Sequence, residues 1–288
     1  LTLTLTLTLT LTLTLTQVSA NMMECPDLFP LGDKWVLLAS LYRTNQWWVG
    51  SLAGDPPRFT PERVGVLDYG NGYAAKTGSA WVQSGAARRL LFGFTGWQEP
   101  TMPHGCGRAL VLPRELRLQG SELQLQPIPE AAVLRTGPVV RSSGDDAPLA
   151  AGSQVEIRLQ CAWAAAAGPP SRGVTGIRTL ASADSAHYTE LGYDWQAQAF
   201  YADHTKCCNT SGPIVQRAPL PLAMLGPMLN LTLYVDGGLL EAFLAGRVIT
   251  PLVAPDVAAG GPPEARVSSI VNTAHGVSCS AESWKLAY

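Results

Sequence analysis

Residues 23–30 read Met-Glu-Cys-Pro-Asp-Leu-Phe-Pro, and the apolar run Trp-Val-Leu-Leu-Ala follows at residues 35–39. The ring of Pro26 fixes its φ angle, and prolines within sheets occur at strand starts and edges. A carboxylate at such a strand start can point into a cleft from a fixed backbone. Glu24 is therefore a candidate catalytic acid, and the alternative for the same string is a pair of solvated acids at a strand end.

The composition is that of a globular chain with many turns. Of its 288 residues, 47% are hydrophobic and 15% are charged, and the formal net charge is −2. A chain with so little charge has no basic surface for nucleic acid or for an anionic membrane, which excludes both as partners. The 28 Gly and 22 Pro are scattered between short apolar runs, and this pattern indicates many short strands.

The cysteine and histidine content argues against a metal centre. The chain has only four histidines, no pair of cysteines has C-x-x-C spacing, and the six cysteines stand at positions 25, 106, 161, 207, 208 and 279. Zinc sites need clustered Cys and His ligands. We therefore expect no metal and no cofactor.

Two features bear on the cellular location. Sequons at Asn209 and Asn230 would accept glycans in a secretory pathway, and they favour an extracellular or vacuolar protein over a cytosolic one. Residues 1–16 are a pure Leu-Thr alternation without a charged or continuous apolar region, so no signal peptide or membrane span is visible there. We exclude this low-complexity repeat from the fold.

Residues 17–118 have the pattern of antiparallel strands. Apolar runs are separated by turn-forming residues such as Gly-Asp-Pro-Pro at 54–57 and Gly-Asn-Gly at 70–72. No stretch keeps a helical apolar period over several turns, which disfavours a parallel sheet wound with helices. The expected strands are residues 35–40, 47–52, 73–77, 81–83 and 90–96.

A change of composition near residue 119 predicts a domain junction, with a second domain over 119–288. Residues 231–236 and 239–244 flank Gly237-Gly238, which is a strong hairpin signal. Residues 154–161 alternate and place their apolar members on one face, namely Val155, Ile157 and Leu159. Such half-buried strands predict a β-sandwich, and the whole chain is expected to be all-β.

Five segments, in order along the chain, resemble motifs of glycoside hydrolase family 32, the invertases and fructan-processing enzymes. Each is a weak signal alone, but five in register over residues 22–244 are specific. The segments are Met23–Pro30, similar to the family's Glu-Cys-Pro-Asp; Leu67–Thr77, similar to D-Y-G-x-x-Y-A-S-K-T; Arg88–Phe94, similar to R-R-I-L-W-G-W; Leu112–Leu116, which matches L-P-R-E-L; and Leu233–Phe243, similar to V-D-x-S-x-V-E-x-F.

The resemblance implies both a fold and an activity. The fold is a five-bladed β-propeller, of which residues 17–118 would form the C-terminal part, followed by a β-sandwich. The activity is that of a β-fructofuranosidase, which hydrolyses the β-fructosyl bond of sucrose or fructans with retention, using an aspartate nucleophile and a glutamate acid/base. Glu24 occupies the position of that acid/base.

The sequence departs from the family pattern at the nucleophile. The W-x-N-D-P-N-G and R-D-P segments that precede the Glu-Cys pair in the family are not found before Glu24. We therefore expect a truncated, inactive hydrolase with an open sheet edge, and the alternative is a non-catalytic carbohydrate-binding remnant. Asp27 is expected on the face opposite Glu24, because the two are three residues apart on an extended strand.

The resemblance also suggests substrate-binding residues. Asp68 matches an aspartate that helps to hold the sugar, and it is the carboxylate best placed to replace a nucleophile. Asn71 stands where relatives commonly have a basic residue. Lys76 is expected either to neutralise a carboxylate of the pocket or to cap its strand. Trp47, Trp48 and Trp97 are expected either to pack in the core of a blade or to stack on a sugar.

Plant-type relatives carry a disulfide in the sandwich at about the spacing seen here between Cys161 and the adjacent pair Cys207 and Cys208. The resemblance therefore implies that Cys161 pairs with Cys207 or Cys208 in an oxidising compartment. Cys25, next to the acid, is expected to be a packed thiol that shapes the site.

Overall fold

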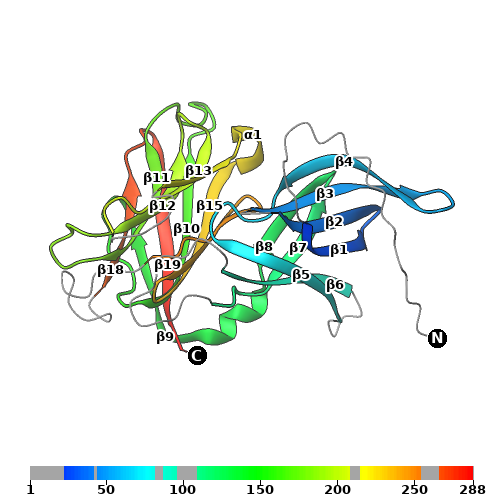
Figure 1. Cartoon of the computed structure of the whole chain (residues 1–288). Coiled ribbons are helices and arrows are strands. Elements are labelled where there is room, and N and C mark those ends of the chain that lie inside the picture. Colours follow the sequence, from blue (N-terminus) through cyan, green and yellow to red (C-terminus); the bar gives the residue numbers. More distant parts are fainter. Residues whose placement is uncertain are drawn as a thin grey trace.

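The computed structural model describes residues 23–41, 44–81, 87–95, 109–207, 215–253 and 266–287. These residues form four antiparallel sheets with very little helix. Figure 1 shows the first two sheets next to each other, with the two sheets of a sandwich beyond them. The expected all-β class, with a partial propeller followed by a β-sandwich, is confirmed.

Each of the first two sheets is a four-stranded meander in which every strand pairs with the next. A sheet of this kind is a blade of a β-propeller. The first blade contains β1 (Met23–Leu31), β2 (Lys34–Leu41), β3 (Thr44–Ala53) and β4 (Arg58–Val66). The second contains β5 (Gly72–Trp81), β6 (Ala87–Thr95), β7 (Arg114–Gln119) and β8 (Glu122–Pro127).

The two blades pack against each other through a shared apolar core. Its members include Phe29, Val36, Leu38 and Val49 of the first blade and Leu91, Leu116, Leu123 and Leu125 of the second. Trp47 lies in this core, and its indole donates to the carbonyl oxygen of Val66 at 3.2 Å. Trp48 is 4% exposed in a separate cluster of the first blade. Both side chains are therefore blade core, and Trp97 lies outside the described residues.

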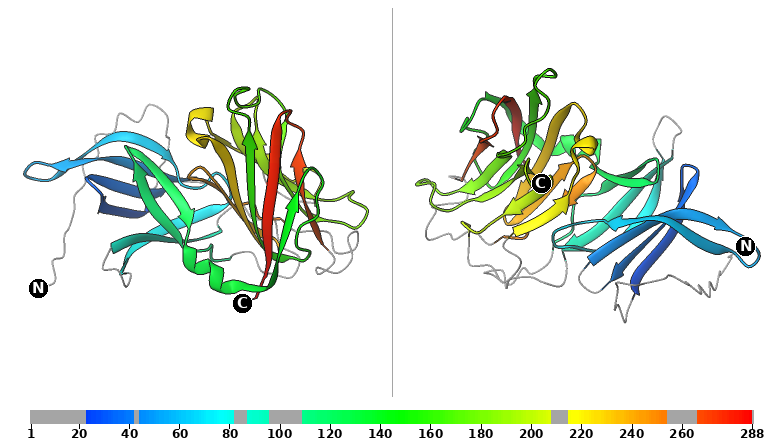
Figure 2. Two further views of the ribbon diagram at one scale, coloured as in Figure 1. Left: turned by 180° about the vertical axis from the view of Figure 1, so that it is seen from behind. Right: turned by 90° about the horizontal axis from the view of Figure 1, so that it is seen from above.

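The second blade extends beyond the junction that the sequence predicted at residues 118–119. β7 and β8 form a hairpin whose turn contains Gly120 at φ +61°, so the predicted boundary falls inside one sheet. The Leu-Gln alternation that suggested the boundary is β8 itself, with Leu123 and Leu125 in the blade core. After Pro127 the short 3₁₀ helix η1 (Pro129–Leu134) leads into the sandwich, as Figure 2 shows.

The sandwich packs a six-stranded sheet on a five-stranded sheet. The first has the order β17-β16-β15-β10-β19-β9 and the second β14-β13-β12-β11-β18. A single core fills the space between them, and the predicted apolar face of Val155, Ile157 and Leu159 lies in it. The bounds are β9 Arg135–Ser143, β10 Gln154–Trp163, β11 Val174–Ala181, β12 Thr189–Asp194, β13 Ala199–Asp203, β14 Val215–Pro219, α1 Leu222–Leu225, β15 Met228–Asp236, β16 Leu239–Leu244, β17 Arg247–Ile249, β18 Val267–Asn272 and β19 Val277–Leu286.

The disulfide of the sandwich differs from the expected one, because Cys161 bonds to Cys279. The two residues face each other in the register of β10 and β19, with their Cα atoms 4.1 Å apart. Directly opposed residues of an antiparallel pair are close enough for this bond, particularly where they do not exchange hydrogen bonds. Cys207 follows β13, which belongs to the other sheet. The prediction of a bond from Cys161 to Cys207 or Cys208 was therefore wrong.

A buried ion cluster joins the second blade to the sandwich. Arg114, at the start of β7, is 2% exposed and donates to Asp68 and to Glu241 at 2.8 Å each. Asp68 follows β4, whereas Glu241 lies in β16 of the sandwich. The same guanidinium donates to the hydroxyl of Thr250 at 2.8 Å. One cation thus serves two carboxylates from distant parts of the chain.

The connection between the blades runs along this junction. The amide nitrogens of Tyr69 and Asn71 donate to the carbonyl oxygens of Val248 and Thr250 at 3.0 and 2.7 Å. A Cβ atom on Gly70 would lie 2.4 Å from the backbone of Thr250, so only glycine fits there. The connection is therefore held against the sandwich by backbone hydrogen bonds on both sides of this glycine.

We expect the disulfide to stabilise the sandwich. Replacing both Cys161 and Cys279 by Ser should lower the free energy of unfolding by about 2–4 kcal/mol, because the bond closes a long loop in the unfolded chain. Urea unfolding of the oxidised proteins measures the difference. Cys25→Ser is the matched control, because this thiol is free. Recovery of a peptide that links Cys161 to Cys207 or Cys208 under non-reducing conditions would contradict the structure.

Arg114→Met should lower the free energy of unfolding by about 3–5 kcal/mol, because Asp68 and Glu241 would stay buried without a counter-charge. The control is Arg141→Gln, whose ion pair with Glu282 is exposed and should contribute about 1 kcal/mol or less. Chemical unfolding compares the two variants. Equal decreases in the free energy of unfolding would show that the buried cluster stabilises the fold no more than an exposed ion pair does.

Glu241 should make the stability of the junction depend on pH. Burial raises the pKa of its carboxyl above the ordinary value, and the charge of Arg114 opposes this only in part. This contribution to stability is fully present below the unfolded pKa of about 4.3, and it is lost as the pH rises through the raised folded pKa. We expect the free energy of unfolding to fall over that window in the wild type and less steeply in Glu241→Gln. Parallel pH profiles of the two proteins would refute this.

Candidate active site

Glu24 lies at the start of β1, the inner strand of the first blade, where it faces the inner strand of the second. The hydroxyl of Tyr73, at the start of β5, donates to Oε2 of Glu24 at 2.7 Å. In a propeller the first strands of neighbouring blades line the axis, so residues at their ends meet in one place. The contact therefore places Glu24 where the inner strands of the two blades meet.

The two inner strands carry the same irregularity at the same position. Cys25, directly after Glu24, has φ +49°, and Ala74, directly after Tyr73, has φ +48°. The strand registers shift at these points, between Glu24 and Asp27 in β1 and between Tyr73 and Lys76 in β5. These are β-bulges, which change the direction of side chains and are common beside active sites.

The bulge in β1 corrects the expected orientation of Asp27. An unbroken strand would place Asp27 on the face opposite Glu24, but the irregular residues between them interrupt the alternation. Asp27 instead reaches β5, where its Oδ2 accepts hydrogen bonds from both the amide and the hydroxyl of Thr77, each at 2.7 Å. Glu24 and Asp27 therefore both contact the second blade.

Lys76 lies beside this acidic stretch but contacts its backbone. Its ammonium group donates to the carbonyl oxygen of Pro26. The sequence suggested that Lys76 would either neutralise a carboxylate or cap its own strand, and this contact is neither. Lys76 instead binds the backbone of Pro26, which follows Cys25 in the bulge.

Asp68 does not lie in an open pocket, because its side chain is 1% exposed. Its carboxylate accepts from Arg114 Nη1, from the amides of Gly70 and Thr250, and from the hydroxyl of Thr250. These four donors occupy the carboxylate, and its near-complete burial closes it to a sugar in this structure. The local sequence could not show that Arg114 and Thr250 converge on it.

Asn71 also belongs to the junction rather than to the surroundings of Glu24. Its side-chain oxygen accepts from Nε2 of Gln216 in β14 at 3.0 Å, and its backbone amide donates to Thr250. The residue as a whole is half-buried. Its expected part in substrate binding stays a prediction.

Tyr73 is the site residue that sequence reasoning missed. It is 8% exposed, and burial first, followed by the hydrogen bond to Glu24, raises the pKa of its phenol to about 12. The phenol therefore stays protonated near neutral pH and acts as a donor. Its hydrogen bond occupies one oxygen of Glu24. The second tyrosine of the D-Y-G-x-x-Y-A motif was the available signal.

The described residues around Glu24 offer no second free carboxylate and no metal site. Asp27 is engaged by Thr77, and Cys25 is a half-buried free thiol, so its expected role in shaping the site stays a prediction. Within the described ranges, no cluster of His, Cys, Asp and Glu could hold a metal ion. No helix in those ranges is long and apolar enough to cross a membrane.

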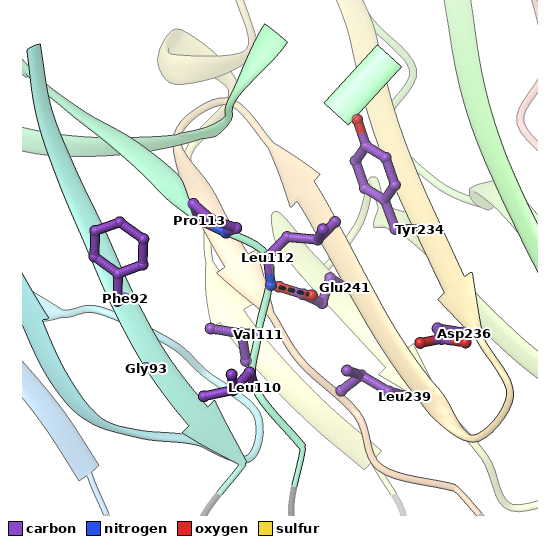
Figure 3. A pocket seen from close by; sticks show the side chains of 10 residues that line it. All are labelled: Phe92, Gly93, Leu110, Val111, Leu112, Pro113, Tyr234, Asp236, Leu239 and Glu241. Carbon is purple, nitrogen blue, oxygen red and sulfur yellow. Dashed lines mark hydrogen bonds between the residues drawn. The ribbon is translucent and has the colours of Figure 1, made fainter. Parts of the chain in front are cut away.

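A cavity of about 410 Å³ lies elsewhere, between the second blade and the sandwich. Figure 3 shows the walls formed by Phe92, Leu110 and Leu239, with Asp236 at one side. Glu241 lines it too, but its carboxylate accepts from the amide of Leu112 at 2.7 Å and from Arg114. Since the lining is mainly apolar and includes neither Glu24 nor Tyr73, this cavity is separate from the candidate site.

Comparisons with solved structures agree with this architecture. An exo-inulinase from Aspergillus awamori aligns with a TM-score of 0.71 and 22% identity, over 92% of this chain and 57% of the other. The fructan 1-exohydrolase IIa of Cichorium intybus aligns with a TM-score of 0.73 and 17% identity, over 92% and 61% of the two chains. At these identities the likeness shows a shared fold.

Curated relatives match over shorter parts of their length. A sucrose-6-phosphate hydrolase of Zymomonas mobilis is 34% identical over 137 residues, which are 43% of this chain and 26% of the relative. The insoluble isoenzyme 1 of β-fructofuranosidase from Daucus carota is 28% identical over 238 residues, or 73% and 37%. The chain thus spans well under half the length of these two relatives.

Family models cover nearly all of the described chain. The model of the glycosyl hydrolases family 32 N-terminal domain matches residues 7–127, and that of the family's C-terminal domain matches residues 130–285. The gap between the two matches falls at the start of η1, where the structure passes from blade to sandwich. The chain belongs to glycosyl hydrolase family 32.

Proposed function

We propose that this chain carries the acid/base side of a β-fructofuranosidase site, which acts on sucrose or a fructan. The contact of Glu24 with Tyr73 between the inner strands of two blades supports this most directly. The relatives named above include a sucrose-6-phosphate hydrolase, a β-fructofuranosidase and an exo-inulinase, and all three names imply cleavage of the same type of bond. In that bond a β-fructosyl unit is attached to an oxygen atom that leaves as an alkoxide.

Glu24 would protonate the leaving oxygen and later remove a proton from water. The leaving alkoxide needs this proton because it is a poor leaving group. Tyr73 donates to Oε2, so Oε1 is the oxygen left to face the substrate. Because Tyr73 remains a donor at neutral pH, it holds the carboxylate in one orientation through both proton transfers.

A retaining glycosidase also needs a nucleophilic carboxylate about 5–5.5 Å from the acid/base. Asp27 is the acid closest to Glu24 along β1, and its Oδ2 is taken up by two hydrogen bonds from Thr77. We infer that residues 17–288 alone lack a working nucleophile and do not turn over fructosides. The same observation favours a second candidate, in which the chain binds a sugar without cleaving it.

We also propose an extracellular or vacuolar location. The cross-strand bond between Cys161 and Cys279 requires an oxidising compartment to persist. The sequon residue Asn230 is exposed on β15, where a glycan could be attached.

Fructose release from sucrose and from inulin tests the function. We expect none from residues 17–288, and turnover when the upstream blades of the Daucus carota relative are fused in front. Glu24→Gln should then lower kcat of the fusion by about 10²–10⁴-fold, because the side chain can no longer give a proton. Arg141→Gln, an exposed sandwich residue, is the control.

The other outcomes separate the candidates. Turnover by the unfused chain that disappears in Glu24→Gln would show that a second carboxylate within it, with Asp27 the nearest, serves as nucleophile. Calorimetric binding of a fructan to a fusion that never turns over would favour the sugar-binding alternative.

A further inference from the structure

Side chains of the second blade bind β1 before and after the bulge next to Glu24. Tyr73 contacts Glu24 itself, Lys76 donates to the carbonyl oxygen of Pro26, and Thr77 donates twice to Asp27. All three side chains come from β5. These contacts therefore span the whole bulge and include Glu24, the proposed acid/base.

Asp27 is the most firmly held residue of this set. Its Oδ2 accepts from the amide and the hydroxyl of Thr77 at 2.7 Å each, and the same hydroxyl accepts from Nε of Arg89 at 2.7 Å. The guanidinium of Arg89 also lies 3.8 Å from Oδ1 of Asp27 and 4.1 Å from the centre of the Phe29 ring. Hydrogen bonds to an ionised carboxylate are about twice as strong as neutral ones.

The bulge needs such support because its backbone is unfavourable in isolation. Cys25 has φ +49°, a conformation that residues with a Cβ atom rarely adopt. Conformations of this kind persist only where the surrounding contacts determine them. The side-chain contact to Glu24 lies before Cys25, and the contacts to the Pro26 carbonyl and the Asp27 side chain lie after it, so the bulge is held from both sides.

We propose that Asp27 and Thr77 form a positioning pair for Glu24, with Arg89 supporting the hydroxyl of Thr77. The pair anchors the bulge to the second blade, and the bulge directs the carboxylate of Glu24 toward Tyr73. This role rests on the proposed function of Glu24 as acid/base. It explains why the carboxylate of Asp27, three residues after Glu24, accepts hydrogen bonds from the second blade instead of facing a substrate.

The free thiol of Cys25 reports on the bulge without any assay of activity. We would measure its rate of alkylation in the native full chain by mass spectrometry of the peptide that contains it. Thr77→Val keeps the shape and the amide but removes the hydroxyl, and it should speed alkylation about tenfold. Thr77→Ser retains the hydroxyl and should stay within about twofold of the wild type.

Two further variants complete the design. Asp27→Asn removes the charge and should also speed alkylation, which covers the case that Thr77→Val does not fold. Arg141→Gln, remote in the sandwich, should leave the rate unchanged. Wild-type rates in both Thr77→Val and Asp27→Asn would overturn the proposal, as would equal acceleration in Thr77→Ser and Thr77→Val.

Kinetics then separate this proposal from the proposed function. In whichever form of the protein turns over, Thr77→Val should lower kcat about tenfold or more while KM stays nearly constant, because small misplacements of a catalytic group are costly. If Cys25 alkylates faster in Thr77→Val but Glu24→Gln does not change the activity, the anchoring of the bulge is supported and the acid/base role of Glu24 is refuted. Faster alkylation with unchanged kcat in an active form would overturn the positioning role alone.

Discussion

The buried guanidinium of Arg114 is the group on which the arrangement of blades and sandwich depends. A charge can be withdrawn from water only where partners neutralise it and satisfy its hydrogen bonds. Asp68, which follows β4, and Glu241 and Thr250, which belong to the β16–β17 part of the sandwich, accept from the two terminal nitrogens of the guanidinium. Its Nε finds no partner among the described residues. Neither of these two parts of the chain can satisfy the charge alone, so the second blade meets the sandwich in one orientation. Apolar packing between the same surfaces would be less directional.

The same junction leads to the candidate site through the chain itself. Asp68 and the connection after it are held against β17, and this connection runs directly into β5. β5 in turn presents Tyr73 to Glu24 and Thr77 to Asp27. The sandwich therefore contributes to the site without touching it, because it fixes the start of the strand that orients the acid. A domain that holds neither Glu24 nor Tyr73 thus helps to position the strand that joins them.

Sequence reasoning erred wherever a residue's role depended on a partner far away in the chain. Asp68 was assigned to a sugar pocket from its motif, yet Arg114 and Thr250 enclose it. Asp27 was assigned to the wrong face because a strand was assumed to alternate without a bulge. Cys161 was paired with the wrong thiol because its partner is set by the neighbour of β10 in the sheet, and that neighbour is the last strand of the chain.

The sequence by itself determined the all-β class, the family and several of the strands, among them those expected at residues 35–40, 47–52 and 73–77. Alternating apolar residues and ordered motifs are local signals, since each strand buries one face whatever lies opposite. Only the tertiary structure decided the partners: Tyr73 for Glu24, Thr77 for Asp27, Arg114 for Asp68 and Cys279 for Cys161. The physical reason is register, because one extra residue in a strand reverses every side chain beyond it.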